Sequence, residues 1–112
     1  MTDATQAIGI LQFALDAVVQ QQQVIANNIA NQDTAGFQAN QVTFESSLAQ
    51  ALGSGGTANA QVSPEGLPSG VNGNNVSLST EMTFMVKNNL ENQTVDNALS
   101  GQFTMLADAL SA

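Results

Sequence analysis

Apolar side chains recur at heptad spacing in the first third of the chain. Successive positions are three and four residues apart, and one of them is a glutamine. The positions are Ile8, Leu11, Leu15, Val18, Gln22, Ile25 and Ile29. This spacing predicts a helix from about Thr5 to Asn31, which would be ~40 Å long at the rise of an α-helix.

The last third carries a second heptad series, which is apolar at both ends and polar in its middle. Its positions are Leu78, Met82, Met85, Asn89, Asn92, Asp96, Leu99, Phe103, Leu106 and Leu110. The series predicts a second helix from about Ser79 to Leu110, ~48 Å long, with Ser77 or Ser79 as its N-cap. We call the two series together the predicted seam.

Polar side chains interrupt both series near their middles. Each would cost about 1–3 kcal/mol if buried without a partner. Paired with one another or with the amides of a neighbouring chain, they would set the register of the helices. The alternative is that they face water in a partly open hairpin. The polar positions are Gln22, Asn89, Asn92 and Asp96.

The middle of the chain lacks heptads. Val42 and Phe44 alternate as in a short strand, and Phe44, Leu48 and Leu52 repeat every four residues as in a short helix. Residues 53–73 hold six of the nine glycines and both prolines, which indicates a flexible loop.

The predicted fold is therefore mainly α, with two long terminal heptad helices packed as a coiled coil. A short strand-and-helix extension and a flexible loop lie between them. The predicted divisions are 1–34 for the first helix and its turn, 35–52 for the extension, 53–75 for the loop and 76–112 for the last helix.

Composition limits the chemistry. The 112 residues contain no cysteine and no histidine, which excludes thiolate metal sites and removes the commonest general base. No glycine-rich phosphate loop follows a strand, and the carboxylates are scattered. We therefore expect no enzyme activity, no catalytic residue, no cofactor, no metal site and no small-molecule substrate.

Charge narrows the choice of partners. The net charge is −8, with one cation against nine carboxylates, so nucleic acid is not an expected partner. Only 9% of residues are charged, against about 25% in typical soluble proteins. Two helices with wide apolar stripes make a small core by themselves. We expect other subunits to complete that core.

The start of the chain has neither a basic segment nor an uninterrupted apolar run. A cleaved secretion signal is not indicated, and no segment approaches the ~18 apolar residues of a membrane span. From these features alone, the expected location is the cytoplasm.

An unusual concentration of asparagine ends the first predicted helix, in the stretch ANNIANQDTAGF at 26–37. Asparagine is a poor helix former but tolerates the left-handed conformation, so Asn31 is the expected exit from the helix. Gly36 is expected to take positive φ in the turn that follows. The amides would satisfy backbone groups at the helix end or reach a neighbouring chain.

This stretch resembles the SNNIANxxTPGY signature of the flagellar rod, hook and hook-associated proteins of bacteria. The matching residues are Asn27, Asn28, Ile29, Ala30, Asn31, Thr34, Gly36 and Phe37. The end of the chain resembles the proximal rod members of that family, at Val76, Leu78, Glu81, Met82, Gln93, Leu99, Ser100, Gly101 and Phe103.

The resemblance implies a structural subunit of the proximal rod of the flagellar basal body, which polymerises through its terminal helices into part of the drive shaft. Implied partners are copies of the chain, FlgC-like rod proteins, a FliE-like adaptor, the membrane ring and the type III export apparatus. The implied location is the periplasmic rod, reached without a cleaved signal peptide. The alternative function is a cytoplasmic helical adaptor or secretion chaperone that binds partner helices.

Overall fold

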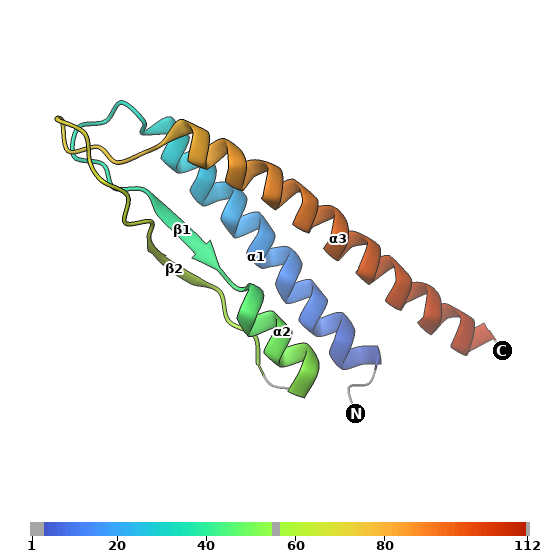
Figure 1. Cartoon of the computed structure of the whole chain (residues 1–112). Coiled ribbons are helices and arrows are strands. Elements are labelled where there is room, and N and C mark those ends of the chain that lie inside the picture. Colours follow the sequence, from blue (N-terminus) through green and yellow to red (C-terminus); the bar gives the residue numbers. More distant parts are fainter. Residues whose placement is uncertain (1–3, 55–56, 112) are drawn as a thin grey trace.

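The computed structural model describes residues 4–54 and 57–111. The elements, in chain order, are α1 (Ala4–Ala30), β1 (Asn40–Thr43), α2 (Glu45–Ser54), β2 (Gln61–Pro64) and α3 (Leu78–Ser111). Helices α1 and α3 form a long antiparallel hairpin, with α2 and the strands beside it (Figure 1). The molecule measures 64 × 22 × 14 Å. This confirms the mainly helical fold with long first and last helices.

The turn after α1 begins at Asn31, as predicted, but Asn31 does not take the left-handed conformation that asparagine tolerates. The Asn31 N–H donates to the carbonyls of Asn27 and Asn28 at 3.2 and 3.1 Å, which completes the last helical turn. Gly36 has φ of 76°, a value that favours glycine because it has no Cβ. The prediction of a positive φ at Gly36 is confirmed.

The start of α3 is capped by a serine. The Ser77 hydroxyl accepts a hydrogen bond from the Thr80 N–H at 3.3 Å, and the Ser77 carbonyl accepts the Glu81 N–H at 2.9 Å. This is the arrangement of an N-cap residue, which satisfies a backbone donor that the helix leaves free. Of the two predicted candidates, Ser77 is the cap.

A strand lies where the sequence pattern indicated only loop. Strand β2 pairs antiparallel with β1, with Val42 opposite Val62 and Asn40 opposite Pro64. The segment 53–75 contains this strand, although its glycines and prolines predicted a flexible loop. Sequence periodicity could not reveal β2, because its pairing comes from backbone hydrogen bonds to a distant strand and not from an apolar face.

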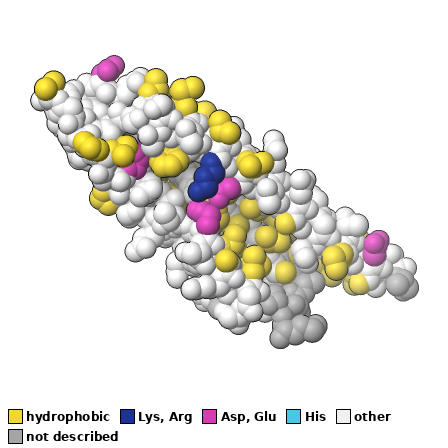
Figure 2. Space-filling model, in the orientation of Figure 1, with side chains coloured by type: hydrophobic (Ala, Val, Ile, Leu, Met, Phe, Trp, Pro, Cys, Tyr) yellow, Lys and Arg dark blue, Asp and Glu magenta, His cyan; other side chains and the backbone are white. Residues whose placement is uncertain are grey.

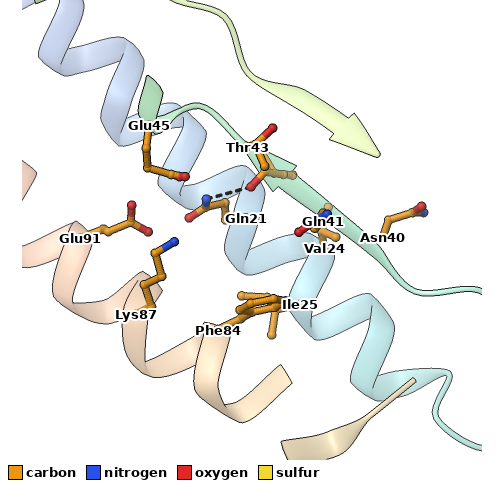
Figure 3. A pocket seen from close by; sticks show the side chains of 11 residues that line it. Gln21, Val24, Ile25, Asn40, Gln41, Thr43, Glu45, Phe84, Lys87 and Glu91 are labelled. Carbon is orange, nitrogen blue, oxygen red and sulfur yellow. Dashed lines mark hydrogen bonds between the residues drawn. The ribbon is translucent and has the colours of Figure 1, made fainter. Parts of the chain in front are cut away.

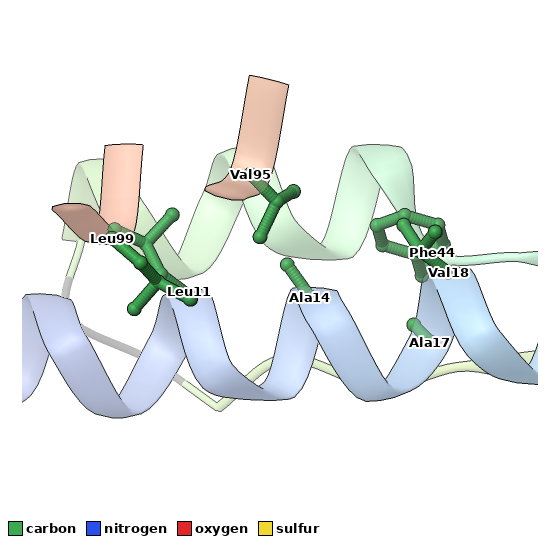
Figure 4. Packing of buried hydrophobic residues seen from close by; sticks show 7 residues of the cluster. All are labelled: Leu11, Ala14, Ala17, Val18, Phe44, Val95 and Leu99. Atoms are coloured by element: carbon green, nitrogen blue, oxygen red, sulfur yellow. The ribbon is translucent and has the colours of Figure 1, made fainter. Parts of the chain in front are cut away.

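The hydrophobic core lies where α1, α2 and α3 meet (Figure 4). Seven residues of this core are buried. Three of those that lie on α1 are valine or alanine, and their small size lets the helices approach closely. The buried cluster consists of Leu11, Ala14, Ala17, Val18, Phe44, Val95 and Leu99. Figure 4 shows Val95 and Leu99 of α3 pointing toward α1, with Leu99 beside Leu11 and Val95 beside Ala14.

The heptad series that the chain buries differs in phase from the predicted seam. On α1 the buried or half-buried series is Ala7, Leu11, Ala14, Val18, Gln21, Ile25 and Asn28. On α3 it is Glu81, Phe84, Asn88, Glu91, Val95, Ala98 and Gln102. The α3 series lies one residue away from most predicted positions, which corresponds to about 100° around a helix.

Two properties account for this difference. Small residues such as Ala14 and Ala98 belong to the buried series, and their size permits close helix packing. The polar members are buried because they find partners across the hairpin, as described below. The prediction followed large apolar side chains at steps of three and four residues and carried that phase through four polar positions, so it weighed neither property.

We expect the close approach at Ala14 to limit the size of the side chain there. Ala14 is fully buried, and overpacking a tight core costs about 1–3 kcal/mol. Ala14→Leu should therefore lower the free energy of unfolding by that amount, measured by urea denaturation followed by circular dichroism. Ala26→Leu, at an exposed position of α1, is the control, and equal midpoints for both variants would contradict the observed packing.

Candidate functional site

Two buried polar layers join the long helices. Gln21 and Asn28 are seven residues apart on α1, and Glu81 and Asn88 are seven apart on α3. The Asn28 amide donates to Glu81 Oε1 at 2.7 Å. The Asn88 amide donates to Gln21 Oε1 at 3.1 Å and to the Val18 carbonyl at 2.8 Å. Each layer thus places an α1 amide against a polar side chain of α3.

The same α1 amides satisfy one edge of strand β1. Asn28 accepts from the Asn40 N–H at 3.2 Å and donates to the Asn40 carbonyl at 2.8 Å. Gln21 donates to the Val42 carbonyl at 3.0 Å, a bond drawn in Figure 3. Alternate residues of a strand present their backbone groups to opposite edges. The seven-residue spacing of Gln21 and Asn28 on α1 therefore corresponds to the two-residue spacing of Asn40 and Val42 on β1.

Two further asparagines close the end of the hairpin. The Asn74 amide donates to the carbonyls of Asn31 and Thr34 at 2.8 and 2.7 Å, after the end of α1. Asn75 accepts from the Ala39 N–H at 2.6 Å and donates to the Leu67 carbonyl at 3.0 Å. Both asparagines are buried. They tie the chain entering α3 to the chain leaving α1.

The signature residues have distinct positions in this network. Asn28 is buried at its centre, whereas Asn27 is exposed. Asn31 donates to the Asn27 carbonyl at 2.8 Å and accepts from the Thr34 hydroxyl at 3.1 Å, which stabilises the turn locally. Ile29 and Phe37 are half-buried, and Ala30 is exposed. A single signature asparagine, Asn28, reaches other elements through its side chain.

The carboxyl groups of Glu65 and Glu81 meet beside Asn28. Glu81 is fully buried, and the Asn28 amide contacts Glu65 Oε2 at 3.4 Å. Burial, followed by the hydrogen bond and the charge of Glu81, raises the pKa of Glu65 from 4.5 to about 8. A charged carboxylate is disfavoured there, because both desolvation and a like charge oppose ionisation.

A shallow groove between α1, β1 and α3 holds the single lysine. Lys87 and Glu91 extend from α3 toward Glu45, at the start of α2 (Figure 3). Burial and the charge of Glu45 raise the pKa of Glu91, and Lys87 opposes this shift. The groove offers amides, methyl groups and these charges.

Within the described part of the chain, no group of three or more metal-ligating side chains comes together. None of the described helices combines the length and apolarity that crossing a bilayer requires.

The structure divides the predicted α1 seam between core and surface. Leu11, Val18 and Ile25 are buried, and Ile8, Leu15 and Ile29 are half-buried. Gln22 is exposed, and the polar layer is formed by Gln21 instead. The prediction placed this layer one residue too far along the chain.

The predicted α3 seam lies mostly at the surface. Only Leu99 is buried, and Asn92 is half-buried. The exposed positions are Leu78, Met82, Met85, Asn89, Asp96, Phe103, Leu106 and Leu110. The polar pairing expected at the predicted positions does not occur within the chain, where Glu81 and Asn88 fill that role. The apolar members of this set form, with the exposed Val86 and Leu90, what we call the outer face of α3.

Apolar side chains are visible along the surface of the molecule in Figure 2, including the region of α3. On the outer face, Leu110 is 80% exposed and Phe103 is 50% exposed. The exposed apolar residues therefore form one group toward each end of the outer face, and exposed apolar patches of this kind are typical of interaction sites. The inner face of α3 is occupied by α1, so the outer face is the one available to other chains.

Sequence reasoning missed Gln21, Glu65, Glu81, Asn88, Asn74 and Asn75 as a network. One signal was present, because the pairs 21/28 and 81/88 each repeat at the heptad interval. The predicted seam also included polar side chains, but in the phase of the large apolar residues, which is one residue later. No sequence signal places Glu65 beside Glu81, because the intervening loop sets their contact.

Comparison with known proteins gives consistent matches. A family model described as "Flagella basal body rod protein" matches residues 10–38. The chain is 30% identical to the flagellar basal body rod protein FlgB of Escherichia coli (strain K12), over 95% of this chain and 94% of that protein. It is 33% identical to FlgB of Bacillus subtilis (strain 168), over 90% of each protein. The similarity therefore extends across both long helices.

We expect the network to depend on Asn28. Asn28→Ala leaves a buried Glu81 oxygen and the backbone of Asn40 without partners, each at a cost of about 1–3 kcal/mol. The free energy of unfolding should fall by at least that amount in urea denaturation. Asn27→Ala, its exposed neighbour, should change stability by less than about 0.5 kcal/mol. Equal losses in the two variants would show that the network is not a stabilising element.

Proposed function

The chain belongs to the FlgB family of flagellar basal body rod proteins, and from this premise we propose that it is a structural subunit of the proximal rod. On this proposal the subunits polymerise through their terminal helices into part of the drive shaft. The relatives are named as rod proteins, which supports a structural role and not an enzymatic one. The chain covers almost the full length of those relatives, so the proposal concerns the whole protein.

The observation that carries the proposal is the exposed outer face of α3. Leu78, Met82 and Met85 near its start and Phe103, Leu106 and Leu110 near its end are exposed at heptad spacing. A heptad series is the pattern by which one helix packs against another. Because α1 already covers the inner face, a second series on α3 suits contact with helices of neighbouring subunits.

The two faces of α3 would then have separate tasks. The inner face, with Asn88 and Val95, holds the hairpin together through hydrogen bonds and apolar packing. The outer face would bury apolar area between subunits, at about 25 cal/mol per Å². On this arrangement α1 and α3 form the wall of the tube, and the segment 35–52 is a small extension outside it.

The proposed partners follow from the family. They are further copies of the chain, FlgC-like rod proteins, a FliE-like adaptor and the membrane ring. The proposed route is export through the type III apparatus without a cleaved signal peptide, ending in the periplasmic rod. The low proportion of charged residues, 9%, supports a surface that neighbours cover.

Localisation separates this proposal from the alternative of a cytoplasmic adaptor or secretion chaperone. A tagged copy should be recovered with purified basal bodies, and cross-linking there should connect it to other rod subunits. Recovery in the cytoplasmic fraction alone, bound to an unassembled partner, would favour the adaptor and contradict the proposal.

We expect a charge on the outer face to block assembly without unfolding the subunit. Leu106→Asp places a carboxylate at an exposed heptad position, where burial against a neighbour would carry a penalty of several kcal/mol. The variant should keep its helical circular dichroism but fail to enter basal bodies, and cells should not swim. Thr104→Asp adds the same charge at an exposed position off the series and serves as the control. Normal motility with Leu106→Asp would count against the outer face as an interface.

A further inference from the structure

Two glutamates from distant parts of the chain meet at the closed end of the hairpin. Glu65 directly follows β2, and its N–H donates to the Ala39 carbonyl at 3.0 Å. Glu81 lies in the first turn of α3. The Asn28 amide, with two N–H groups, makes its short bonds to Glu81 Oε1 and the Asn40 carbonyl, at 2.7 and 2.8 Å. Its contact with Glu65 at 3.4 Å is therefore weak.

Each glutamate also has a buried oxygen that no donor satisfies. These atoms are Glu65 Oε1 and Glu81 Oε2, which make no hydrogen bond to a donor group among the described residues. The two carboxyl groups lie close together, because both contact the same nitrogen, Asn28 Nδ2, at 3.4 Å from Glu65 and 2.7 Å from Glu81. A proton on Glu65 supplies the missing donor, because a carboxylic acid donates one O–H while a carboxylate only accepts.

No cation compensates this pair within the described structure. Helix α1 brings the neutral amide of Asn28 to it, and β1 brings the backbone of Asn40. On α3 the facing charged group is Glu81 itself, whose charge raises the pKa of the Glu65 carboxyl. Lys87 is six residues further along α3 and lines the groove with Glu45 and Glu91. Two ionised carboxylates would therefore repel each other without a counter-ion.

We propose that Glu65 and Glu81 form a proton-dependent latch, which holds β2 and the following loop onto the hairpin when Glu65 is protonated. In the closed latch the Glu65 O–H donates to the Glu81 carboxylate. When Glu65 loses its proton to solvent, that hydrogen bond is replaced by repulsion between the two carboxylates. Strand β2, whose residues Gln61, Val62 and Pro64 are exposed, then separates from β1, while α1 and α3 stay packed through their core.

The direction of the pH response follows from Glu65. Its pKa is raised from 4.5 to about 8, first by burial and then by the hydrogen bond and charge of Glu81. A raised pKa in the folded state means that the stabilisation is fully present below pH 4.5 and is lost as the pH rises toward about 8. The latch is therefore closed in neutral and mildly acidic solution and opens under alkaline conditions.

The test combines a titration with a measure of local opening. The side-chain carboxyl of Glu65, followed by ¹³C NMR between pH 5 and 9.5, should titrate near pH 8. Hydrogen exchange of the Glu65 N–H, corrected for its intrinsic pH dependence, should accelerate by up to about tenfold per pH unit below that midpoint and then level off. Amides in the middle of α1 should not follow this course.

Variants separate the latch from general electrostatics. Glu65→Gln places a permanent amide donor beside Glu81, so exchange at residue 65 should become independent of pH. Glu91→Gln removes the other carboxyl whose pKa is raised and should leave the transition near pH 8 intact. Asp108→Asn, at an exposed position of α3, is the matched control. The latch is refuted if Glu65 titrates near 4.5, if Glu65→Gln keeps the transition, or if exchange shows no pH dependence in the unmodified chain.

Discussion

The buried hydrogen bonds of Asn28 are the constraint on which the rest of this structure depends. One side chain, 1% exposed, contacts β1, the residue after β2 and α3. A buried amide with fixed partners permits a single register, because moving α3 by one turn would leave Asn28 and Glu81 without their bonds. The second layer, Gln21 with Asn88, repeats the constraint one heptad away. The hairpin is thus aligned by polar contacts and filled by apolar ones.

These layers also solve a problem of strand β1. A strand edge with free backbone groups invites pairing with another chain. The amides of Gln21 and Asn28 occupy those groups at Val42 and Asn40, so α1 acts in part as a neighbouring strand would. The need to satisfy these backbone groups explains why amides occupy heptad positions where leucine would ordinarily pack. It also explains why glutamine and asparagine suit these positions, since each combines a donor and an acceptor.

The side of α3 that packs against α1 determines which apolar residues stay exposed for contacts with other subunits. Because the hairpin packs through Ala14, Val95 and the polar layers, most of the larger apolar residues of α3 remain outside. A core formed by those larger residues would have left little apolar surface for neighbours. Packing through small and polar side chains instead gives α3 two usable faces. In a family of rod proteins, this combination of a closed hairpin and an apolar outer face is physically consistent with a subunit that associates laterally.

The sequence by itself determined the elements that depend on local and periodic signals. The two long helices, a serine cap at Ser77 or Ser79 and the positive φ of Gly36 follow from heptads, hydroxyl chemistry and the freedom of glycine. The turn signature also indicated the family. Only the tertiary structure decided which side of each helix is buried. Two heptad series that lie one residue apart on the same helix can both be amphipathic, and they differ in the residues that they contact. The tertiary structure also decided strand β2 and the contact of Glu65 with Glu81, because each joins residues that are distant in the sequence and share no local pattern.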